Sequence, residues 1–60
     1  MNVSLYARAP DKTELVYVGG IKFARQGTPV QFDSEDQARE VGRQLCDRFP
    51  VLKKYKLYPK

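Results

Sequence analysis

The sequence contains no histidine, and this absence removes the side chain that most often acts as a general base near neutral pH. Histidine is also the commonest neutral ligand of metal ions. A single cysteine, Cys46, can neither form a disulfide within the chain nor supply the four ligands of a structural zinc site. The composition therefore predicts a non-enzymatic protein with no catalytic residues, no metal, no cofactor and no internal disulfide.

Long apolar runs are missing as well. No stretch approaches the roughly 18 apolar residues that span a membrane. Residues 1–4 have no basic segment followed by a long apolar stretch, so we expect no signal peptide. A chain of 60 residues buries only about 60% of the surface that its unfolded form exposes, so few side chains remain to enclose a small-molecule ligand. A homodimer would add stability. We expect one cytoplasmic domain over residues 1–60, a short gene product of the kind that phages and mobile elements encode.

The N-terminal half has the pattern of β-strands. Apolar and polar residues alternate over residues 3–9, and residues 14–18 are rich in β-branched and aromatic side chains. Pro10-Asp11-Lys12 predicts a turn between these runs, with the aspartate side chain capping the bend. Gly19-Gly20 predicts a hairpin into a third strand over residues 21–26.

A helix is predicted to begin after Ser34, because Ser34 and Gln37 have the spacing of a capping box. Pro50 predicts its end near Phe49. An apolar stripe at helical spacing comprises Ala38, Val41, Leu45, Cys46 and Phe49. We expect this stripe to pack on the sheet with the thiol of Cys46 in the core, and Gly42 to permit a close approach.

Two segments complete the predicted fold. Residues 28–32 are a strand start, an edge or a loop, since Pro29 lacks an N–H group. Residues 51–58 predict a final strand with Val51, Tyr55 and Leu57 on one face. The expected fold class is α+β: a small antiparallel sheet of three to five strands, in the order β-β-β-(β)-α-β, with one helix packed on one face.

The net charge of +4 arises at the C-terminus, where residues 51–60 contain four lysines and no acid. Lysines interleaved with tyrosines can neutralise phosphates while a ring stacks on an exposed base. The candidate nucleic-acid-binding residues are Lys53, Lys54, Tyr55, Lys56 and Tyr58, with Arg8, Lys22 and Arg25 from the N-terminal half. A structural interpretation stays open, because lysines and a proline on an edge strand also prevent aggregation.

The other charged residues have a structural explanation. The acids between positions 33 and 40 lie at the predicted helix N-terminus, where they complement the helix dipole. Three pairs of opposite charge have the spacing of ion pairs within a helix: Glu35 and Arg39, Glu40 and Arg43, and Arg43 and Asp47. We therefore expect a solvated, self-compensated helix face, although Arg39 and Arg43 could serve as contacts.

Residues 30–38, with the sequence VQFDSEDQA, resemble the strand-to-helix junction of three-stranded DNA-binding domains, such as plant AP2 domains and the arm-binding domains of phage-type integrases. In that group a strand ending in Phe precedes Ser or Thr, acidic residues and Ala. The resemblance implies a sheet that enters the major groove, with Tyr6, Arg8, Lys22 and Arg25 as candidate contacts. The predicted strand after Pro50 is an addition to the pattern of that group.

Two functions fit these observations. The first is a small binding module associated with nucleic acid through its basic C-terminal strand. The alternative is a protein-binding module (an inhibitor, adaptor or small structural component) that docks through a sheet edge or the helix, for example on an acidic protein surface.

Overall fold

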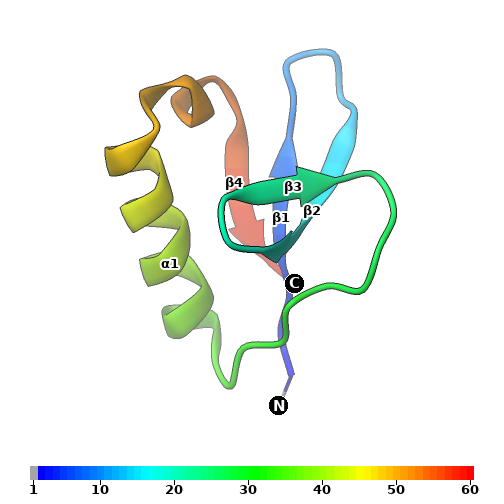
Figure 1. Cartoon of the computed structure of the whole chain (residues 1–60), viewed down its shortest axis with the longest axis vertical. Helices are drawn as coiled ribbons and strands as arrows, with labels where there is room; N and C mark the ends of the chain where they lie inside the picture. Colours follow the sequence, from blue (N-terminus) through cyan, green and yellow to red (C-terminus); the bar gives the residue numbers. More distant parts are fainter. Residues whose placement is uncertain (1) are drawn as a thin grey trace.

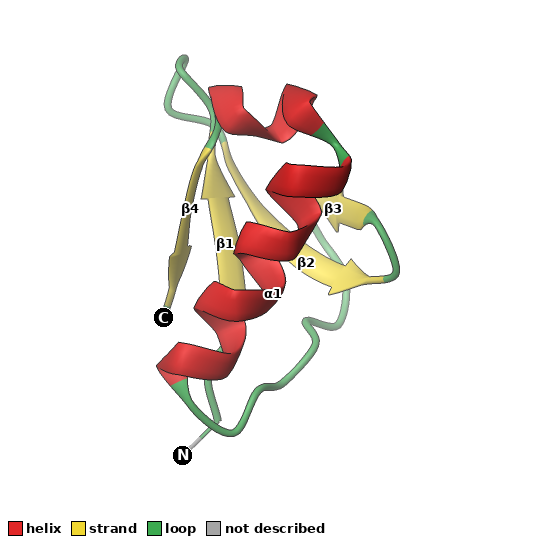
Figure 2. Ribbon diagram, turned by 90° about the vertical axis from the view of Figure 1, so that its left-hand side faces the viewer, coloured by secondary structure: helices red, strands yellow, loops and turns green. Residues whose placement is uncertain are grey.

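The computed structural model of the chain describes residues 2–60 and has one helix lying across an antiparallel sheet (Figures 1 and 2). Its elements are β1 (Leu5–Arg8), β2 (Glu14–Gly19), β3 (Lys22–Ala24), α1 (Glu35–Arg48), the 3-10 helix η1 (Pro50–Lys54) and β4 (Lys56–Pro59). The four strands have the spatial order β3-β2-β1-β4. The predicted α+β fold, with one helix on one face of a small antiparallel sheet, is confirmed. None of the helices within residues 2–60 has the length and apolar character to cross a membrane.

Strand β1 lies in the middle of the sheet and pairs with β2 on one side and with β4 on the other. Ala7 is opposite Leu15 of β2 and Leu57 of β4. Successive side chains of a strand point to opposite faces, so Leu5 and Ala7 share the face that α1 covers. Both are almost completely buried, with 1% of their surface exposed.

The core lies between this face of the sheet and the helix. Its buried members are Leu5, Tyr17, Phe32, Ala38 and Leu45, which come from two strands, the loop before α1 and the helix itself. Gly42 is buried too, and a Cβ atom at this position would lie 3.3 Å from Cδ2 of Leu57 and 3.5 Å from Cδ1 of Leu5. The predicted reason for this glycine, a close approach of helix to sheet, is therefore confirmed.

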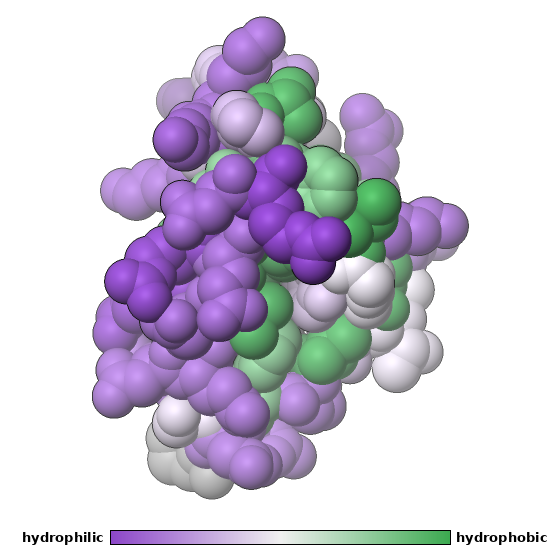
Figure 3. Space-filling model, turned by 60° about the vertical axis from the view of Figure 1, so that its left-hand side comes forward, coloured by the Kyte–Doolittle hydropathy of each residue, from purple (hydrophilic) through white to green (hydrophobic). Residues whose placement is uncertain are grey.

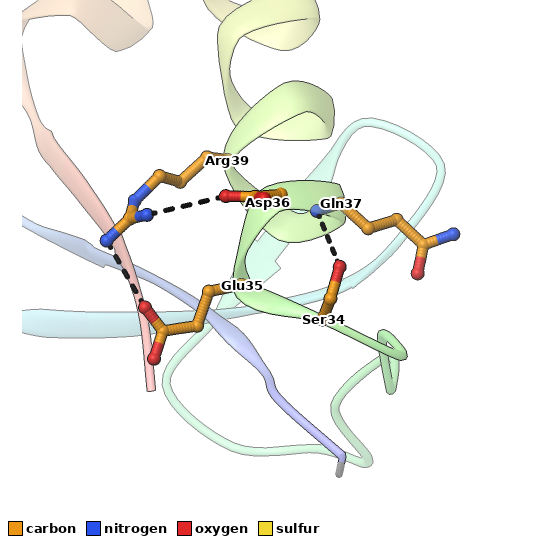
Figure 4. A network of polar contacts seen from close by, with 5 residues as sticks. All are labelled: Ser34, Glu35, Asp36, Gln37 and Arg39. Carbon is orange, nitrogen blue, oxygen red and sulfur yellow. Dashed lines mark hydrogen bonds and ion pairs between the residues drawn. The ribbon is translucent and has the colours of Figure 1, made fainter.

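The helix begins as its sequence predicts. Ser34 is the N-cap, and its Oγ accepts a hydrogen bond from the backbone N–H of Gln37 at 3.2 Å (Figure 4). Oε1 of Gln37 accepts from the N–H of Asp33 at 2.9 Å rather than from the N–H of Ser34, so the reciprocal bond of the capping box is displaced by one residue. These bonds satisfy backbone donors that have no partner within the helix.

The last predicted strand is wrong in its first half, because residues 51–54 belong to η1. Pro50 occupies the first turn of this 3-10 helix, where its missing N–H costs nothing. The N–H groups of Leu52 and Tyr55 donate to the carbonyls of Phe49 and Leu52 at 2.9 and 3.0 Å. This tight turn reverses the chain after α1, and β4 can then pair with β1. Val51, predicted to share a strand face, is 61% exposed.

The segment between β2 and α1 contains fewer strand residues than the sequence predicts. Strand β3 begins at Lys22, because Ile21 lies in the turn and is 65% exposed. Residues 28–32 form a loop with one isolated bridge, in which the N–H groups of Val3 and Phe32 donate to each other's carbonyls at 2.9 and 2.8 Å. Gly19 and Gly20 have φ values of 120° and 59°, which the bulged end of the hairpin requires.

The turn between β1 and β2 forms as predicted. Oδ1 of Asp11 accepts a hydrogen bond from the N–H of Thr13 at 2.9 Å, and the N–H of Lys12 donates to the carbonyl of Ala9 at 2.8 Å. Lys12 has a φ of 73°. The aspartate side chain thus caps a bend that the proline before it prepares.

Candidate nucleic-acid interface

The face of the sheet opposite α1 carries a cluster of aromatic and charged side chains. We call it the open face and define it by Tyr6, Arg8, Glu14, Lys56, Tyr58 and Lys60. Arg8 of β1 is opposite Glu14 of β2 and Lys56 of β4, and Tyr6 is opposite Tyr58. Because Leu5 and Ala7 face the helix, these alternate residues face away from it.

The two tyrosines of the open face lie against one another. Their ring centroids are 5.8 Å apart and the ring planes differ by 20°. The guanidinium carbon of Arg8 lies 5.6 Å from the Tyr58 centroid, and Nζ of Lys60 lies 5.4 Å from the Tyr6 centroid. Each ring is half-buried and within the range of a cation–π contact. The arrangement is a pair of aromatic rings flanked by positive charge.

Glu14 is the single acid of the open face. Its carboxylate accepts a hydrogen bond from the hydroxyl of Tyr58, and its Oε2 lies 3.6 Å from Nη2 of Arg8. The bond from Tyr58, followed by the charges of Lys60 and Arg8, lowers the pKa of the Glu14 carboxyl below its usual value. The same bond raises the pKa of the Tyr58 phenol, because it holds the proton that ionisation would remove.

A shallow hollow of about 270 Å³ opens on this face, lined by Arg8, Lys56 and Tyr58. Two of these side chains are cationic and the third is aromatic. The hollow therefore combines the two kinds of group that bind a nucleotide, a charge for the phosphate and a ring for the base.

The structure brings together three of the eight residues predicted from sequence, namely Arg8, Lys56 and Tyr58. The other five lie elsewhere. Lys53 and Tyr55 line a groove between α1 and β4, on the helix side of the sheet, and Lys54 belongs to η1. Lys22 lies on β3, separated from β4 by two strands. The prediction of one basic strand over residues 51–58 is therefore wrong in its first half, because Lys53 and Lys54 belong to η1.

Arg25 follows the end of β3 and lies near the turn between β1 and β2. Hydrogen bonds from Thr13 are the main reason that the pKa of the Asp11 carboxyl is lowered, and the charge of Arg25 contributes to a smaller degree. Arg25 is thus placed beside a local acid rather than in the cluster of the open face.

Three members of the open face, Tyr6, Glu14 and Lys60, are not among the eight residues. Of its aromatic and cationic members, Tyr6 is indicated only by the resemblance to three-stranded DNA-binding domains, and Lys60 only by the charge of the C-terminus. The signal that identifies both is the register between β1 and β4, which places Tyr6 opposite Tyr58. No periodicity within either strand contains that information.

The groove between α1 and β4 has a volume of about 470 Å³ and is lined in part by Leu5, Gly42, Cys46 and Leu57. Cys46 is half-buried there, so its predicted place inside the core is wrong. Cys46 lies one helical turn beyond Gly42, and both residues line the groove, so the sheet covers the apolar stripe only in part at Cys46.

The exposed face of α1 is covered by hydrophilic side chains, with a strip of apolar ones beside it (Figure 3). Nη2 of Arg39 lies 3.3 Å from Oε1 of Glu35 (Figure 4), and Nη2 of Arg43 lies 2.6 Å from Oε1 of Glu40. The predicted pairs Glu35–Arg39 and Glu40–Arg43 are confirmed, whereas Arg43 pairs with Glu40 and not with Asp47. Arg39 and Arg43 are compensated by neighbouring acids, unlike the cations of the open face, which outnumber its one acid.

The outer edge of β4 offers few backbone groups to a further strand. Ser4 and Lys60 exchange two backbone hydrogen bonds, of 3.1 and 2.9 Å. Bonded pairs recur at every second residue of an antiparallel ladder, so Leu57 and Pro59 direct their backbone groups outward. Pro59 has no N–H to donate, and this protects the edge against strand addition.

Comparison with known proteins adds no family to these observations: no protein-family model matches the chain, and neither do curated proteins or solved structures at a significant level.

Proposed function

We propose that this chain is a non-enzymatic module that binds nucleic acid through the open face of its sheet. The observation that supports the proposal best is the stacked pair Tyr6 and Tyr58 with cations beside both rings. Exposed aromatic rings bind bases regardless of sequence, and neighbouring cations bind the phosphates. The single free thiol of Cys46 suits a reducing compartment, so we place the module in the cytoplasm.

The charge of the open face sets the expected strength of binding. Arg8, Lys56 and Lys60 are its cations, and Glu14 offsets one of them. Three phosphate contacts to a single strand correspond to a slope of about −2 in a plot of log affinity against log salt concentration. We therefore expect binding that is readily measured at low salt and weakens at moderate salt.

The test is a fluorescence anisotropy titration of labelled oligonucleotides at several salt concentrations. The variant combines Arg8→Gln, Lys56→Gln and Lys60→Gln, which should abolish binding at moderate salt. A matched control combines Lys22→Gln, Lys53→Gln and Lys54→Gln, which removes the same charge from other surfaces. Equal losses in the two variants, or wild-type affinity that does not depend on salt, would contradict the proposal.

The alternative, a protein partner that docks through a sheet edge, has weaker support. Strand addition needs backbone hydrogen-bond donors at an edge of the sheet. At the β4 edge Pro59 has no N–H, and β3 at the other edge has only three residues. A protein partner could instead dock beside α1, in the groove that Cys46 and Leu57 line. Recovery of one protein at stoichiometric yield from cells, with no oligonucleotide binding by the pure chain, would favour this function.

A further inference from the structure

Building on the proposed function, on which this step rests, we infer that the hollow lined by Arg8, Lys56 and Tyr58 takes one unpaired base, so that the module selects single-stranded over duplex nucleic acid.

The position of the hollow is the first reason. β4 lies at the edge of the sheet, and Tyr6 is the cross-strand neighbour of Tyr58 on the inner side. Arg8 and Lys56 are opposite one another in the adjacent row of side chains, and the hollow opens between this row and Tyr58. A planar base can enter beside the ring without displacing any strand. It can also stack on the guanidinium of Arg8, which is planar and weakly hydrated.

The second reason is the spacing of the cations along β4. Lys56 and Lys60 lie two residues before and two residues after Tyr58, so all three side chains point to the same face. Neighbouring members of this series are about 7 Å apart along the strand. A ring with one cation on either side is the arrangement by which proteins follow a phosphate backbone while stacking a base.

The third reason is the acid at the end of the ring. Glu14 accepts the hydrogen bond from the Tyr58 hydroxyl and lies beside Arg8. A phosphate that approached this corner would meet a carboxylate, whereas an N–H group at the edge of an unpaired base would meet a hydrogen-bond acceptor. This corner of the hollow therefore favours a base over a phosphate. Duplex DNA presents its bases already paired and stacked, and it cannot offer one to the hollow unless a nucleotide is first extruded.

The experiment compares a labelled oligothymidylate of twelve nucleotides with a duplex of twelve base pairs at low salt. Wild-type protein should bind the single strand more tightly. Tyr58→Leu removes the ring and should weaken single-strand binding by about 5-fold to 100-fold, with duplex binding unchanged. Tyr58→Phe keeps the ring and should stay within about twofold of wild type. Tyr55→Leu is the matched control, because Tyr55 is also half-buried but lines the groove beside α1.

A measurement on the wild-type protein keeps the test valid if Tyr58→Leu fails to fold. The ring protons of Tyr58 should shift upfield in NMR spectra when the oligothymidylate is added, because a stacked base shields them. Saturated binding without this shift, or a Tyr58→Leu variant that loses duplex and single-strand affinity equally, would overturn the inference and leave the proposed function standing. Failure of the wild-type protein to bind either oligonucleotide would overturn both.

Discussion

The hydroxyl of Tyr58 donates a hydrogen bond to the carboxylate of Glu14, two residues that lie 44 positions apart and on strands that are not neighbours in the sheet. β1 passes between them, and its Arg8 lies 3.6 Å from the same carboxylate. The contact joins β2 to β4 across the open face, and it holds the one acid of that face beside Arg8.

This contact predicts how the phenol and the carboxyl titrate. Tyr58 should ionise above its ordinary value of 10.0, and Glu14 below its ordinary value of 4.5. The contribution of the neutral phenol to stability is present below its unfolded pKa and is lost as the pH rises through the higher folded pKa. The contribution of the Glu14 carboxylate to stability is present above its unfolded pKa and is lost as the pH falls through the lower folded pKa.

Absorbance of the phenolate measures the first titration, and Glu14→Gln should move the pKa of Tyr58 downward. Glu40→Gln is the control, because Glu40 pairs with Arg43 on α1 and has no contact with the open face. A Tyr58 pKa that is the same in wild type and Glu14→Gln would contradict the hydrogen bond.

The charge of Glu14 predicts an effect on binding as well. Glu14→Gln removes the acid that offsets Arg8, so affinity for an oligonucleotide should rise, by about two- to tenfold at low salt. Glu40→Gln changes the net charge by the same amount on the self-compensated face of α1, and its affinity should change less. Titrations of the two variants side by side test the prediction, which is wrong if both gain equally.

Leu5 predicts how much the small core contributes to stability. This side chain is 1% exposed and lies beneath Gly42 of the helix. Leu5→Ala should lower the free energy of unfolding by about 2–5 kcal/mol, since it removes buried methyl groups and leaves a cavity. Ile21→Ala is the control at a position that is 65% exposed, where the change should stay within about 0.5 kcal/mol. Urea unfolding measures both, and similar losses would mean that Leu5 is not central to the core.

Gly42 gives a prediction about the distance between helix and sheet. Gly42→Ala should change the free energy of unfolding by less than about 1 kcal/mol, because the gain in helix propensity is offset by the 3.3 Å approach to Leu57. Gly42→Leu cannot be accommodated and should destabilise the fold by about 1–3 kcal/mol or more. Gln44→Leu is the control for leucine on an exposed helix position. A harmless Gly42→Leu would show that the helix can move away from the sheet.

Elements that depend on neighbouring residues are predictable from the sequence. Ser34 begins α1 by accepting a bond from Gln37, three residues along, and Asp11 caps its turn through Thr13, two residues along. These contacts form within a short segment, so the residues that determine them are adjacent in the chain. The helix, the first hairpin and the α+β class could be inferred for this reason.

The errors lie where distant segments meet. The sequence suggests a strand from Val51, but the chain must reverse after α1 to bring β4 beside β1, and η1 provides that reversal. Cys46 has the spacing of a core residue, yet it lines the groove beside α1 and is only half-buried. The spacing of apolar residues identifies the apolar side of a helix, but it does not say how much of that side the sheet will cover.

The order of the strands and the α-helix, the start of α1 and the excess of positive charge follow from local contacts or from composition, and the sequence alone is enough to predict them. The grouping of charges on one surface depends instead on how distant strands pair. The register of β1 against β4 places Tyr6 beside Tyr58, and Lys56 with Arg8, while the turn of η1 directs Lys53 to the other side of the sheet. Strand register results from the packing of the whole core, and the residues of one strand do not specify the side chains that the neighbouring strand will bring beside them.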